Sequence, residues 1–576
     1  MKKLLPFLRP YAKESVLSPL FKLLEAGFDL LVPIIVKDMI DTGIANADRP
    51  HIWILCGVLA VFAVVGLACS LTAQYFAAKA AVGFSTGLRS ALFSHIQKFT
   101  YAQTDRAGTS TLITRMTADI NQTQTGVNMT LRLLLRSPII VFGAMILAFT
   151  VNAECAWIFV VVIPLLAAVV FSIMLAGIPL YRRVQQNLDR VTAQTRENLN
   201  GVRVIRAFRK EQEEIDRFEV ANAEHNRVQN RVGRISALMN PFTLLIVNGG
   251  LIALLLSGAV RVDSGIMTKG EVFALTNYMS QILVELVKFA DTIITVNKSL
   301  ACAARIEAVL ETPVGMEIAE RPEEPSASGS AVCFRNAGLT YADNAAPSVS
   351  GIDLTVFPGE TVGIIGSTGS GKTSVINLIP RFYDATEGSV SVNGKDVRSY
   401  DPEVLREKIA VVPQKAVLFR GTVRSNLLWG NGNATDAELW EALERAQAKE
   451  FIEQKEGGLD APVAQNGRNF SGGQRQRLTI ARALVRKAEI LILDDSSSAL
   501  DYATDAALRS ALRNLPERPT VFLISQRTAS IQHADRILVL EEGRPAGIGT
   551  HEELLQSCPV YREIYESQFR KGGETA

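Results

Sequence analysis

A glycine-rich stretch is the first part of the sequence whose residue types and spacing could carry chemistry. It follows the apolar run TVGII and precedes a helix-forming stretch, the context that a phosphate-binding loop requires. Glycines let backbone N–H groups wrap phosphates, the lysine supplies positive charge, and the threonine hydroxyl can reach Mg²⁺. We therefore predict a phosphate-binding loop made of Gly366, Ser367, Thr368, Gly369, Ser370, Gly371, Lys372 and Thr373.

Two adjacent acids close a second apolar run, ILILD, later in the chain. Asp494 ends this predicted strand, which places its carboxylate to hold Mg²⁺ through the water shell of the ion. Asp495 follows directly as a second carboxylate at the end of this strand. The alternation of such strands with helices predicts a largely parallel sheet flanked by helices.

The elements that position these groups occupy only the second half of the chain, because the first half is far more apolar. The whole chain has 576 residues, of which 48% are hydrophobic. Two runs of 27 residues lack Asp, Glu, Lys and Arg, and each exceeds the roughly 20 residues that a spanning helix needs. We predict six spans, from these two runs (52–78 and 155–181), two more apolar runs (137–153 and 235–260) and two weaker, charged candidates (15–41 and 271–300).

The distribution of Lys and Arg predicts the orientation of these spans. Residues 182–234 hold twelve and residues 79–136 hold seven, whereas 42–51 and 261–270 hold one and two. By the positive-inside rule, the long connections and both ends of the chain are cytoplasmic.

The start, MKKLLPFLRPYAK, predicts an interfacial helix. The net charge of +2 indicates no nucleic-acid partner, and the six scattered cysteines show no metal-binding spacing.

Charged residues inside the first and last predicted spans need partners. Each one at mid-bilayer costs roughly 2.5–3.5 kcal/mol. Glu25 and Asp29 share one helical face with Lys22, and Glu285 shares a face with Lys288. One hypothesis is that Glu25, Asp29 and Glu285 line a polar translocation cavity; the alternative is that Glu25 pairs with Lys22 and Glu285 with Lys288 at a packed helix interface.

A composition change separates the two halves. Residues 311–330 are rich in Pro, Glu, Ser and Gly and predict a linker. We therefore expect a transmembrane domain over 1–310 and a soluble nucleotide-binding domain over 331–576.

The segment FSGGQRQR, residues 470–477, closely resembles the signature of the ABC family of ATPases. Tyr341, Gln414 in VVPQKAVLF, and SALD ending at Asp501 resemble further motifs of that family in the same order. In the first half, the segment from Gly108 to Asp119 and the segment ENLNGVRVIRAF, residues 197–208, resemble patterns of ABC exporters. The resemblance covers essentially the full chain and implies a six-span half-transporter fused to one ATPase domain.

The resemblance also implies roles for individual residues. Tyr341 would stack on adenine, Gln414 would sense Mg²⁺ and couple the site to the membrane helices, and Asp501 would communicate across a dimer. The signature would begin a helix whose N-terminus faces the terminal phosphate bound by the opposite subunit. ATP, Mg²⁺ and a second subunit are therefore expected, with the signature residues Ser471, Gly472, Gly473 and Gln474 acting in the partner's site.

Two hydrolytic positions depart from the family pattern. Asp495 stands where active members carry Glu, and Gln526 stands where they carry His. The shorter carboxylate is withdrawn by about an ångström, a displacement that can cost on the order of a hundredfold in rate. Glutamine can donate a hydrogen bond but cannot carry a positive charge. The pair suggests retained ATP binding with impaired cleavage, as in the degenerate-site subunit of a heterodimeric multidrug-type exporter.

These observations predict a chain that exports a hydrophobic or amphipathic drug, lipid or peptide across the cell membrane. Its partner would be a second half-transporter with Glu and His at the two hydrolytic positions. Closure of the ATPase domains would be transmitted near residues 104–110 and 206–213. The alternatives are a homodimeric exporter with slow hydrolysis and a membrane regulator that binds ATP.

Overall fold

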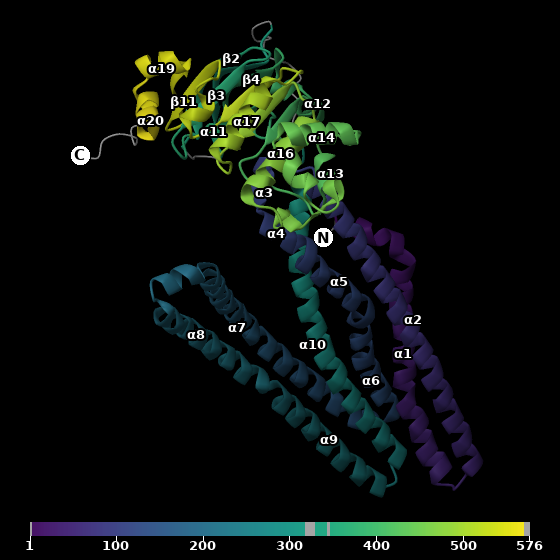
Figure 1. The fold of residues 1–576 in the computed structure, drawn as a ribbon. Coiled ribbons are helices and arrows are strands. Elements are labelled where there is room, and N and C mark those ends of the chain that lie inside the picture. The colour runs from purple at the N-terminus through teal and green to yellow at the C-terminus, as the bar shows by residue number, and fades with distance from the viewer. Residues whose placement is uncertain (1–2, 317–328, 342–345, 570–576) are drawn as a thin grey trace. The chain divides into compact units, whose positions relative to one another are not determined.

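The computed structural model describes residues 3–316, 329–341 and 346–569, so most of the predicted linker lies outside the described residues. The chain divides into two compact units, one formed by Met1–Gln97 with Thr109–Pro313 and the other by Lys98–Gly108 with Val314–Ala576. Figure 1 shows a first unit made of long helices and a second unit built around sheets.

The first unit is entirely helical in its described part. Its elements in chain order are η1 (Leu5–Tyr11), α1 (Ala12–Asp38), η2 (Met39–Ile44), α2 (Arg49–Ile96), α4 (Thr109–Thr114), η3 (Arg115–Asp119), α5 (Ile120–Met129), η4 (Thr130–Leu134), α6 (Arg136–Val151), α7 (Ala153–Ala207), α8 (Glu211–Ala237), α9 (Met239–Asp263) and α10 (Lys269–Glu311).

Local signals in the sequence explain where the long helices begin. Asp48 accepts a hydrogen bond from the His51 N–H at 3.1 Å at the start of α2, and Asn152 accepts one from the Cys155 N–H at 3.0 Å at the start of α7. Thr268 and Glu271 form a reciprocal capping box at the start of α10. These caps satisfy N–H groups that have no partner within a helix.

Four helical stretches in the described residues are long and apolar enough to cross a membrane, namely Arg49–Ile96, Thr109–Val151, Ala153–Ala207 and Glu211–Asp263. The other two predicted spans, within α1 and α10, are helical but carry the charges noted above, so six spans remain a prediction. α7 has 55 residues and is therefore about 80 Å long, well beyond the hydrocarbon thickness of a bilayer. The prediction of long helical extensions beyond the spans agrees with this length.

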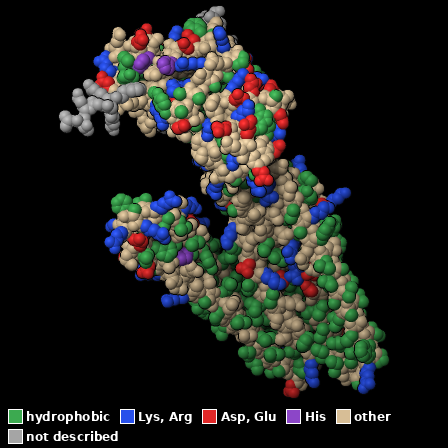
Figure 2. All heavy atoms as spheres, viewed as in Figure 1, with side chains coloured by type: hydrophobic (Ala, Val, Ile, Leu, Met, Phe, Trp, Pro, Cys, Tyr) green, Lys and Arg blue, Asp and Glu red, His purple; other side chains and the backbone are tan. Residues whose placement is uncertain are grey.

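Apolar side chains cover the outside of the spanning helices. Trp53, Ile54, Val64 and Leu67 on α2 are all more than 60% exposed. Figure 2 shows hydrophobic side chains over most of the visible face of the helical unit. The inside is also apolar, with Phe159, Leu254 and other side chains of α6, α7, α9 and α10 packed in one core. Side chains that are apolar on both faces suit helices surrounded by lipid.

The N-terminal segment predicted as an interfacial helix is a short 3₁₀ helix, η1. Leu4 just before it is 1% exposed and packs in a cluster with Phe84, Leu88 and Ile306. The segment therefore packs on the helical unit itself.

The second unit contains three sheets. The largest has the strand order β12-β11-β3-β10-β9-β6, in which only β12 is antiparallel to its neighbour. Its strands are β3 (Thr361–Gly366), β6 (Ile409–Val412), β9 (Ile490–Asp494), β10 (Thr520–Ile524), β11 (Arg536–Glu541) and β12 (Arg544–Gly549). An antiparallel sheet, β2-β1-β4-β5, comprises β1 (Val332–Leu339), β2 (Val349–Val356), β4 (Glu387–Val392) and β5 (Lys395–Asp396), and a small one pairs β7 (Gly421–Thr422) with β8 (Pro462–Val463).

Helices flank the large sheet, as the strand–helix alternation predicted (Figure 1). The helices described in the second unit are α3 (Tyr101–Ala107), α11 (Lys372–Leu378), η5 (Val397–Ser399), α12 (Pro402–Glu407), α13 (Val423–Leu427), α14 (Asp436–Arg445), α15 (Lys449–Glu453), η6 (Gly458–Asp460), η7 (Gln465–Gly467), α16 (Gly472–Val485), α17 (Tyr502–Arg513), α18 (Thr528–Ile531), α19 (His551–Ser557) and α20 (Pro559–Phe569). β3, β9 and β10 are adjacent parallel strands, so their carboxyl ends meet at one edge of the sheet.

Helix α3 belongs to the ATPase unit although it lies far from it in sequence. The ring of Tyr101 stacks on Phe382 with centroids 4.3 Å apart, and the Arg406 guanidinium lies 5.5 Å from the centre of the Phe382 ring. The Tyr383 hydroxyl donates a hydrogen bond to Asp105. These contacts depart from the predicted boundaries, which assigned all of residues 1–310 to the membrane domain.

Candidate functional site: a nucleotide cavity

The glycine-rich loop joins the end of β3 to the start of α11. Gly369 and Gly371 have φ angles of 85° and 91°, in the region that favours glycine. A Cβ atom at Gly371 would lie 2.3 Å from Val349 Cγ1 and 2.6 Å from the Ser348 carbonyl oxygen. The backbone therefore passes close to β2, and a side chain at this position would force the loop open.

Lys372 is buried at the base of this loop. Its Nζ donates to the carbonyl oxygens of Gly366 and Ser367 at 2.8 and 2.7 Å. Burial lowers the pKa of Lys372, and the nearby Asp495 and Asp494 oppose this effect. The ammonium group is thus held in place by neutral carbonyls while it faces two carboxylates across the cavity.

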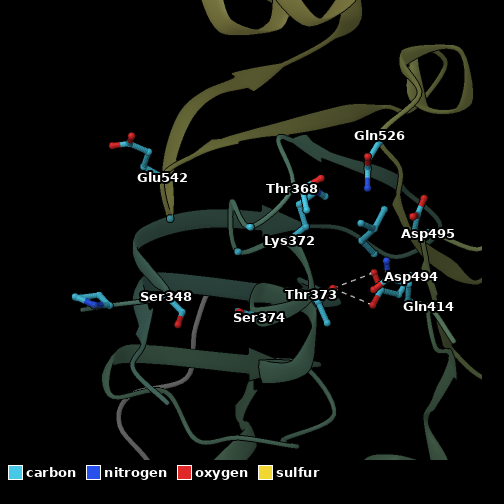
Figure 3. A pocket seen from close by; sticks show the side chains of 15 residues that line it. Ser348, Thr368, Lys372, Thr373, Ser374, Gln414, Asp494, Asp495, Gln526 and Glu542 are labelled. Atoms are coloured by element: carbon cyan, nitrogen blue, oxygen red, sulfur yellow. Dashed lines mark hydrogen bonds between the residues drawn. The ribbon is translucent and has the colours of Figure 1, made fainter. Parts of the chain in front are cut away.

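Thr373 and Asp494 lie together at the ends of α11 and β9. The Thr373 hydroxyl is within hydrogen-bonding distance of both carboxylate oxygens of Asp494, at 3.2 and 3.0 Å (Figure 3). Burial raises the pKa of Asp494, and the Thr373 hydrogen bond opposes this effect. A hydroxyl and a carboxylate oxygen are the ligand types that Mg²⁺ prefers.

Asp495, Gln414 and Gln526 lie on the same cavity, which has a volume of about 470 Å³. Asp495 has a φ angle of 44°, which is uncommon for a residue with a side chain. Burial raises the pKa of Asp495, while Lys372 and a hydrogen bond from Gln414 oppose the rise. Figure 3 shows Gln526 and Asp495 near each other at one end of this cavity.

Several residues that line the cavity were not predicted from the sequence. Ser348, Ser374, Glu542 and Gly543 all contribute to its wall. Gly543 lies in the turn between β11 and β12, and its carbonyl accepts a hydrogen bond from the Ser350 N–H at 2.9 Å. The strand order of the sheet places this turn beside the glycine-rich loop, so no local sequence signal could have identified the turn as part of the cavity.

The residues present fit a nucleotide with Mg²⁺. Ser370 Oγ is buried in the loop and has no hydrogen-bond partner among the described residues. A buried hydroxyl without a partner is costly unless a ligand satisfies it. Ser370 does not itself line the cavity; the groups on the cavity that fit a phosphate and Mg²⁺ are the Lys372 ammonium, the Thr373 hydroxyl and the Asp494 carboxylate.

The remaining predicted nucleotide residues do not line this cavity. The Tyr341 hydroxyl donates to Ser374 Oγ at 3.0 Å, and its ring lies perpendicular to that of Tyr383. Asp501 is exposed just before α17. The signature caps α16, where the Ser471 N–H donates to Gln474 Oε1 at 3.0 Å and the Gln474 N–H donates to Ser471 Oγ at 3.3 Å.

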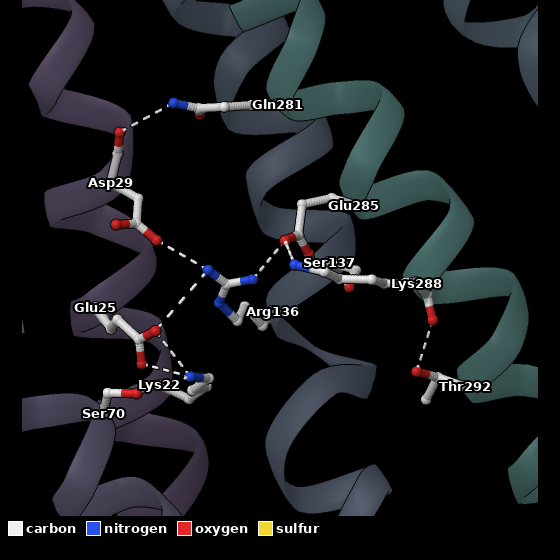
Figure 4. A network of polar contacts seen from close by, with 10 residues as sticks. All are labelled: Lys22, Glu25, Asp29, Ser70, Arg136, Ser137, Gln281, Glu285, Lys288 and Thr292. Carbon is white, nitrogen blue, oxygen red and sulfur yellow. Dashed lines mark hydrogen bonds and ion pairs between the residues drawn. The ribbon is translucent and has the colours of Figure 1, made fainter. Parts of the chain in front are cut away.

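The charged residues predicted for a translocation cavity meet in the helical unit around a residue that sequence reasoning missed. Arg136, at the start of α6, donates to Glu285 on α10 at 2.6 Å and to Asp29 on α1 at 2.8 Å (Figure 4). Its only sequence signal is its position directly before a charge-free apolar run. We call the connected set the Arg136 network; it comprises Lys22, Glu25, Asp29, Arg136, Ser137, Glu285 and Lys288.

Most members of the Arg136 network are paired with other members, although Arg136 Nε is buried and has no hydrogen-bond partner among the described residues. Lys22 pairs with Glu25 at 2.5 Å, and Lys288 pairs with Glu285 at 3.1 Å. The side chains of Glu25 and Glu285 are only 14% and 6% exposed, whereas that of Asp29 is 47% exposed. The interface pairs of the alternative hypothesis are thus present, and Asp29 is the predicted cavity residue that remains accessible.

Comparisons with known proteins agree with this architecture. The ABC transporter transmembrane region matches residues 15–286, and the ABC transporter family matches residues 349–498. An uncharacterized ABC transporter ATP-binding protein of Mycobacterium tuberculosis is 38% identical over 97% of both chains, and the ABC transporter ATP-binding protein YfiB of Bacillus subtilis is 35% identical over 100% of both.

Two further relatives carry more specific names. An ATP-dependent lipid A-core flippase of Chromobacterium violaceum is 31% identical over 99% of this chain and 97% of its own. The solved structure of a bacterial Atm1-family ABC exporter with ATP bound has the same fold, with a TM-score of 0.80 over 98% of this chain and 99% of its own at 22% identity. The chain therefore belongs to the ABC transporter family, with a helical transmembrane region and an ATPase domain that binds ATP with Mg²⁺ and couples its ATPase activity to transport.

Proposed function

We propose that this chain is the degenerate-site subunit of a heterodimeric ABC exporter for hydrophobic or amphipathic substrates. The observation that carries the proposal is that Asp495 and Gln526, the two departures from the family pattern, lie together on one cavity. The same cavity is lined by Lys372, Thr373 and Asp494, which match the pattern. The loss is confined to groups that act on water and the terminal phosphate, so binding is retained and cleavage is slowed.

The chemistry of the two departures supports this reading. The Asp495 carboxylate is one methylene shorter than that of glutamate, and general-base catalysis depends on hydrogen-bond contact with the attacking water. Gln526 is neutral at every pH and cannot share the proton or the charge that histidine offers. When bound, Mg²⁺ would neutralise phosphate charge, and we propose Thr373, Asp494 and Gln414 as the residues that hold it, partly through water.

The signature supports a role in a second site. Ser471 and Gln474 satisfy each other through the capping box and are not drawn into this chain's own cavity. α16 has 14 residues, so its N-terminus presents a substantial positive dipole to an anion. We propose that Ser471, Gly472, Gly473 and Gln474 complete the competent site of the partner, with Asp501 at the same dimer contact and Tyr341 stacking on adenine in this chain's site.

Coupling between ATP and the membrane runs through the ends of the long helices. We propose that α3 moves with the ATPase unit, because Tyr101 and Asp105 contact Phe382 and Tyr383 there. The turn between α7 and α8, near residues 206–213, serves as the second transmission point. ATP then closes two ATPase domains and turns an inward-facing cavity outward, and hydrolysis mainly at the partner's site resets it.

The membrane part of the proposal rests on the composition of the helices. We propose six spans in the cell membrane, with both chain ends and the ATPase domain cytoplasmic. The proposed domain limits are 1–310, 311–330 and 331–576, except that Lys98–Gly108, which includes α3, groups with the ATPase unit. The apolar helix surfaces suit an amphipathic drug, lipid or peptide, and the named lipid A-core flippase is one relative with a lipid substrate. Asp29, as the accessible carboxylate of the Arg136 network, is the proposed polar contact in the cavity.

Restoring the missing groups tests the degenerate site. The chain is purified with every polypeptide that assembles with it, and turnover is compared between the natural chain and the Asp495→Glu/Gln526→His double variant. In the complex with the natural chain we expect the partner's site to carry most of the hydrolysis, so Asp495→Ala should barely change turnover. The double variant should add hydrolysis at this chain's own site. A large loss of turnover in Asp495→Ala would overturn the assignment.

Two alternatives make different predictions. A homodimeric exporter in which Asp495 is a slow base requires this polypeptide alone in the active complex. A membrane regulator requires ATP binding without ATP-dependent flux in proteoliposomes. The exposed signature and the α3 contacts favour a working exporter over a regulator.

A further inference from the structure

The segment after β10 carries Gln526 into the nucleotide cavity. Its backbone N–H groups need hydrogen-bond acceptors from another part of the chain. α18, which follows it, has only four residues, Thr528–Ile531. The residue before it, Arg527, makes no capping hydrogen bond with its side chain. The first N–H groups of a helix lack internal partners, so such a short helix depends on an external acceptor.

Gln568, in the last turn of α20, provides that acceptor. Its Oε1 accepts hydrogen bonds from the N–H of Thr528 at 2.9 Å and from the Thr528 hydroxyl at 2.8 Å. Its Nε2 donates to the carbonyl oxygen of Gln526 at 2.7 Å. One amide group therefore uses both of its ends to hold the backbone on either side of Arg527.

The helix that carries Gln568 is anchored independently of this segment. Tyr561 of α20 is fully buried, and its hydroxyl lies 2.7 Å from Nδ1 of His551. Arg562 donates to the carbonyl oxygens of Leu555 and Gln556 at 2.8 and 2.7 Å, at the end of α19. Gln568 is thus presented from an anchored helix, and its amide joins that helix to α18. Arg509 and Asp505 of α17 also hold α18, through the Ala529 carbonyl at 2.6 Å and the Ser530 hydroxyl at 3.2 Å.

We infer that Gln568 is a positioning residue of the nucleotide site, which fixes the backbone at Gln526 and so sets how its side chain meets the terminal phosphate of ATP. Within the part of the chain that the structure describes, the Gln526 carbonyl is the one group of a cavity-lining residue to which the Gln568 side chain is hydrogen-bonded. The inference is independent of whether the second subunit is identical, because it concerns only this chain's own motifs.

The test measures nucleotide binding to this polypeptide in the full-length complex. An azido-ATP photolabel marks each polypeptide separately on a gel, and unlabelled ATP or ADP competes with it. Gln568→Ala should weaken competition by ATP about three- to tenfold, the equivalent of one or two hydrogen bonds, and leave competition by ADP nearly unchanged. The selectivity rests on the proposed function, in which Gln526 takes the position that meets the terminal phosphate, the group that ADP lacks.

Two further variants sharpen the result. Gln568→Glu keeps an acceptor for Thr528 but loses the donor to Gln526, so it should show the same ATP-selective loss. Ser567→Ala is the matched control, because the Ser567 hydroxyl bonds only to the Ile564 carbonyl at 2.8 Å within α20. In a Gln526→Ala background the effect of Gln568→Ala should disappear, since the side chain being positioned is gone.

Equal weakening of ATP and ADP would show a purely structural role and overturn the inference, as would unchanged binding of both. If Gln568→Ala does not assemble, Gln568→Glu decides: a ratio of ATP to ADP affinity equal to that of the natural chain would overturn the inference.

Discussion

The nucleotide cavity and the Arg136 network both bring cations and carboxylates together inside the protein, yet they differ in how fully those charges are paired. Among the described residues, Lys372 in the cavity donates to two carbonyl oxygens, and Asp494 accepts a hydrogen bond from the Thr373 hydroxyl. In the network, Arg136 contacts Glu285 and Asp29 directly in ion pairs. Hydrogen bonds to neutral groups leave the charges of Lys372 and Asp494 available to a ligand, whereas ion pairs offset the charges of the network and hold its helices together.

This difference predicts which quantity a substitution lowers: the free energy of unfolding in the network, and the affinity for a ligand in the cavity. Removing one partner from a buried ion pair leaves the other charge uncompensated, which destabilises the fold. Removing a group that awaits a ligand leaves the fold nearly unchanged and weakens binding. The comparison therefore separates stability from affinity, and substitutions in the two regions should do opposite things.

The largest expected effect is on stability in the network. Arg136→Leu leaves Asp29 without its cation and Glu285 with Lys288 alone, so the free energy of unfolding should fall by about 3 kcal/mol, at the lower end for a broken buried ion pair. Unfolding in detergent, followed by circular dichroism, measures it. Arg132→Leu is the control, because Arg132 reaches only the neutral Asn128 oxygen at 3.5 Å. Equal losses in the two variants would contradict the structural role of the network.

In the cavity, the next largest effect should be a loss of ATP affinity and not of stability. Lys372→Ala removes the buried ammonium, so ATP affinity at this chain's site should fall by about a hundredfold while the unfolding transition stays close to that of the natural chain. Photolabelling of the chain with competing ATP measures the affinity. Lys395→Ala removes the same charge from an exposed residue that faces the Tyr400 ring and should leave affinity unchanged. Loss of folding in Lys372→Ala would break the distinction between the regions.

Acid should weaken Mg²⁺-dependent nucleotide binding in the cavity at a higher pH than the ordinary pKa of aspartate would predict. Burial raises the pKa of Asp494, so its carboxylate takes up a proton above the ordinary range near about 3.9. The protonated group holds Mg²⁺ poorly, and Mg²⁺-dependent nucleotide binding should therefore decline by about tenfold as the pH falls through the raised pKa. Binding titrations across pH, with Asp494→Asn as the variant that lacks this group, isolate its contribution. The same pH profile in both proteins would refute it.

The smallest effect compares two buried serines. The Ser137 hydroxyl donates to Glu285 at 3.0 Å, so Ser137→Ala should lower the free energy of unfolding by about 1 kcal/mol. Ser370 Oγ has no partner among the residues described, so Ser370→Ala should leave the free energy of unfolding unchanged. Paired unfolding curves of the two variants measure the difference. Identical unfolding curves for the two variants would contradict the proposed difference in pairing between the network and the cavity.

The sequence alone determined the parts of this protein that depend on local pattern. The spacing of Gly366, Gly371, Lys372 and Thr373 predicted the loop between β3 and α11, because phosphate loops use backbone conformations that only such spacing allows. Long charge-free runs predicted spanning helices, since a bilayer excludes unpaired charge over a fixed length. Asp495 and Gln526 were also visible as departures, because the family pattern names their positions.

Only the tertiary structure decided which distant groups meet. Arg136 pairs with Asp29 and Glu285 because three helices far apart in sequence converge, and α3 joins the ATPase unit through Tyr101. Gln568 reaches Gln526 because β11 and α18 pack against α20. Local propensity reports a residue's own helix or strand, whereas these contacts arise from packing, which satisfies each buried polar group with whatever partner the fold brings near.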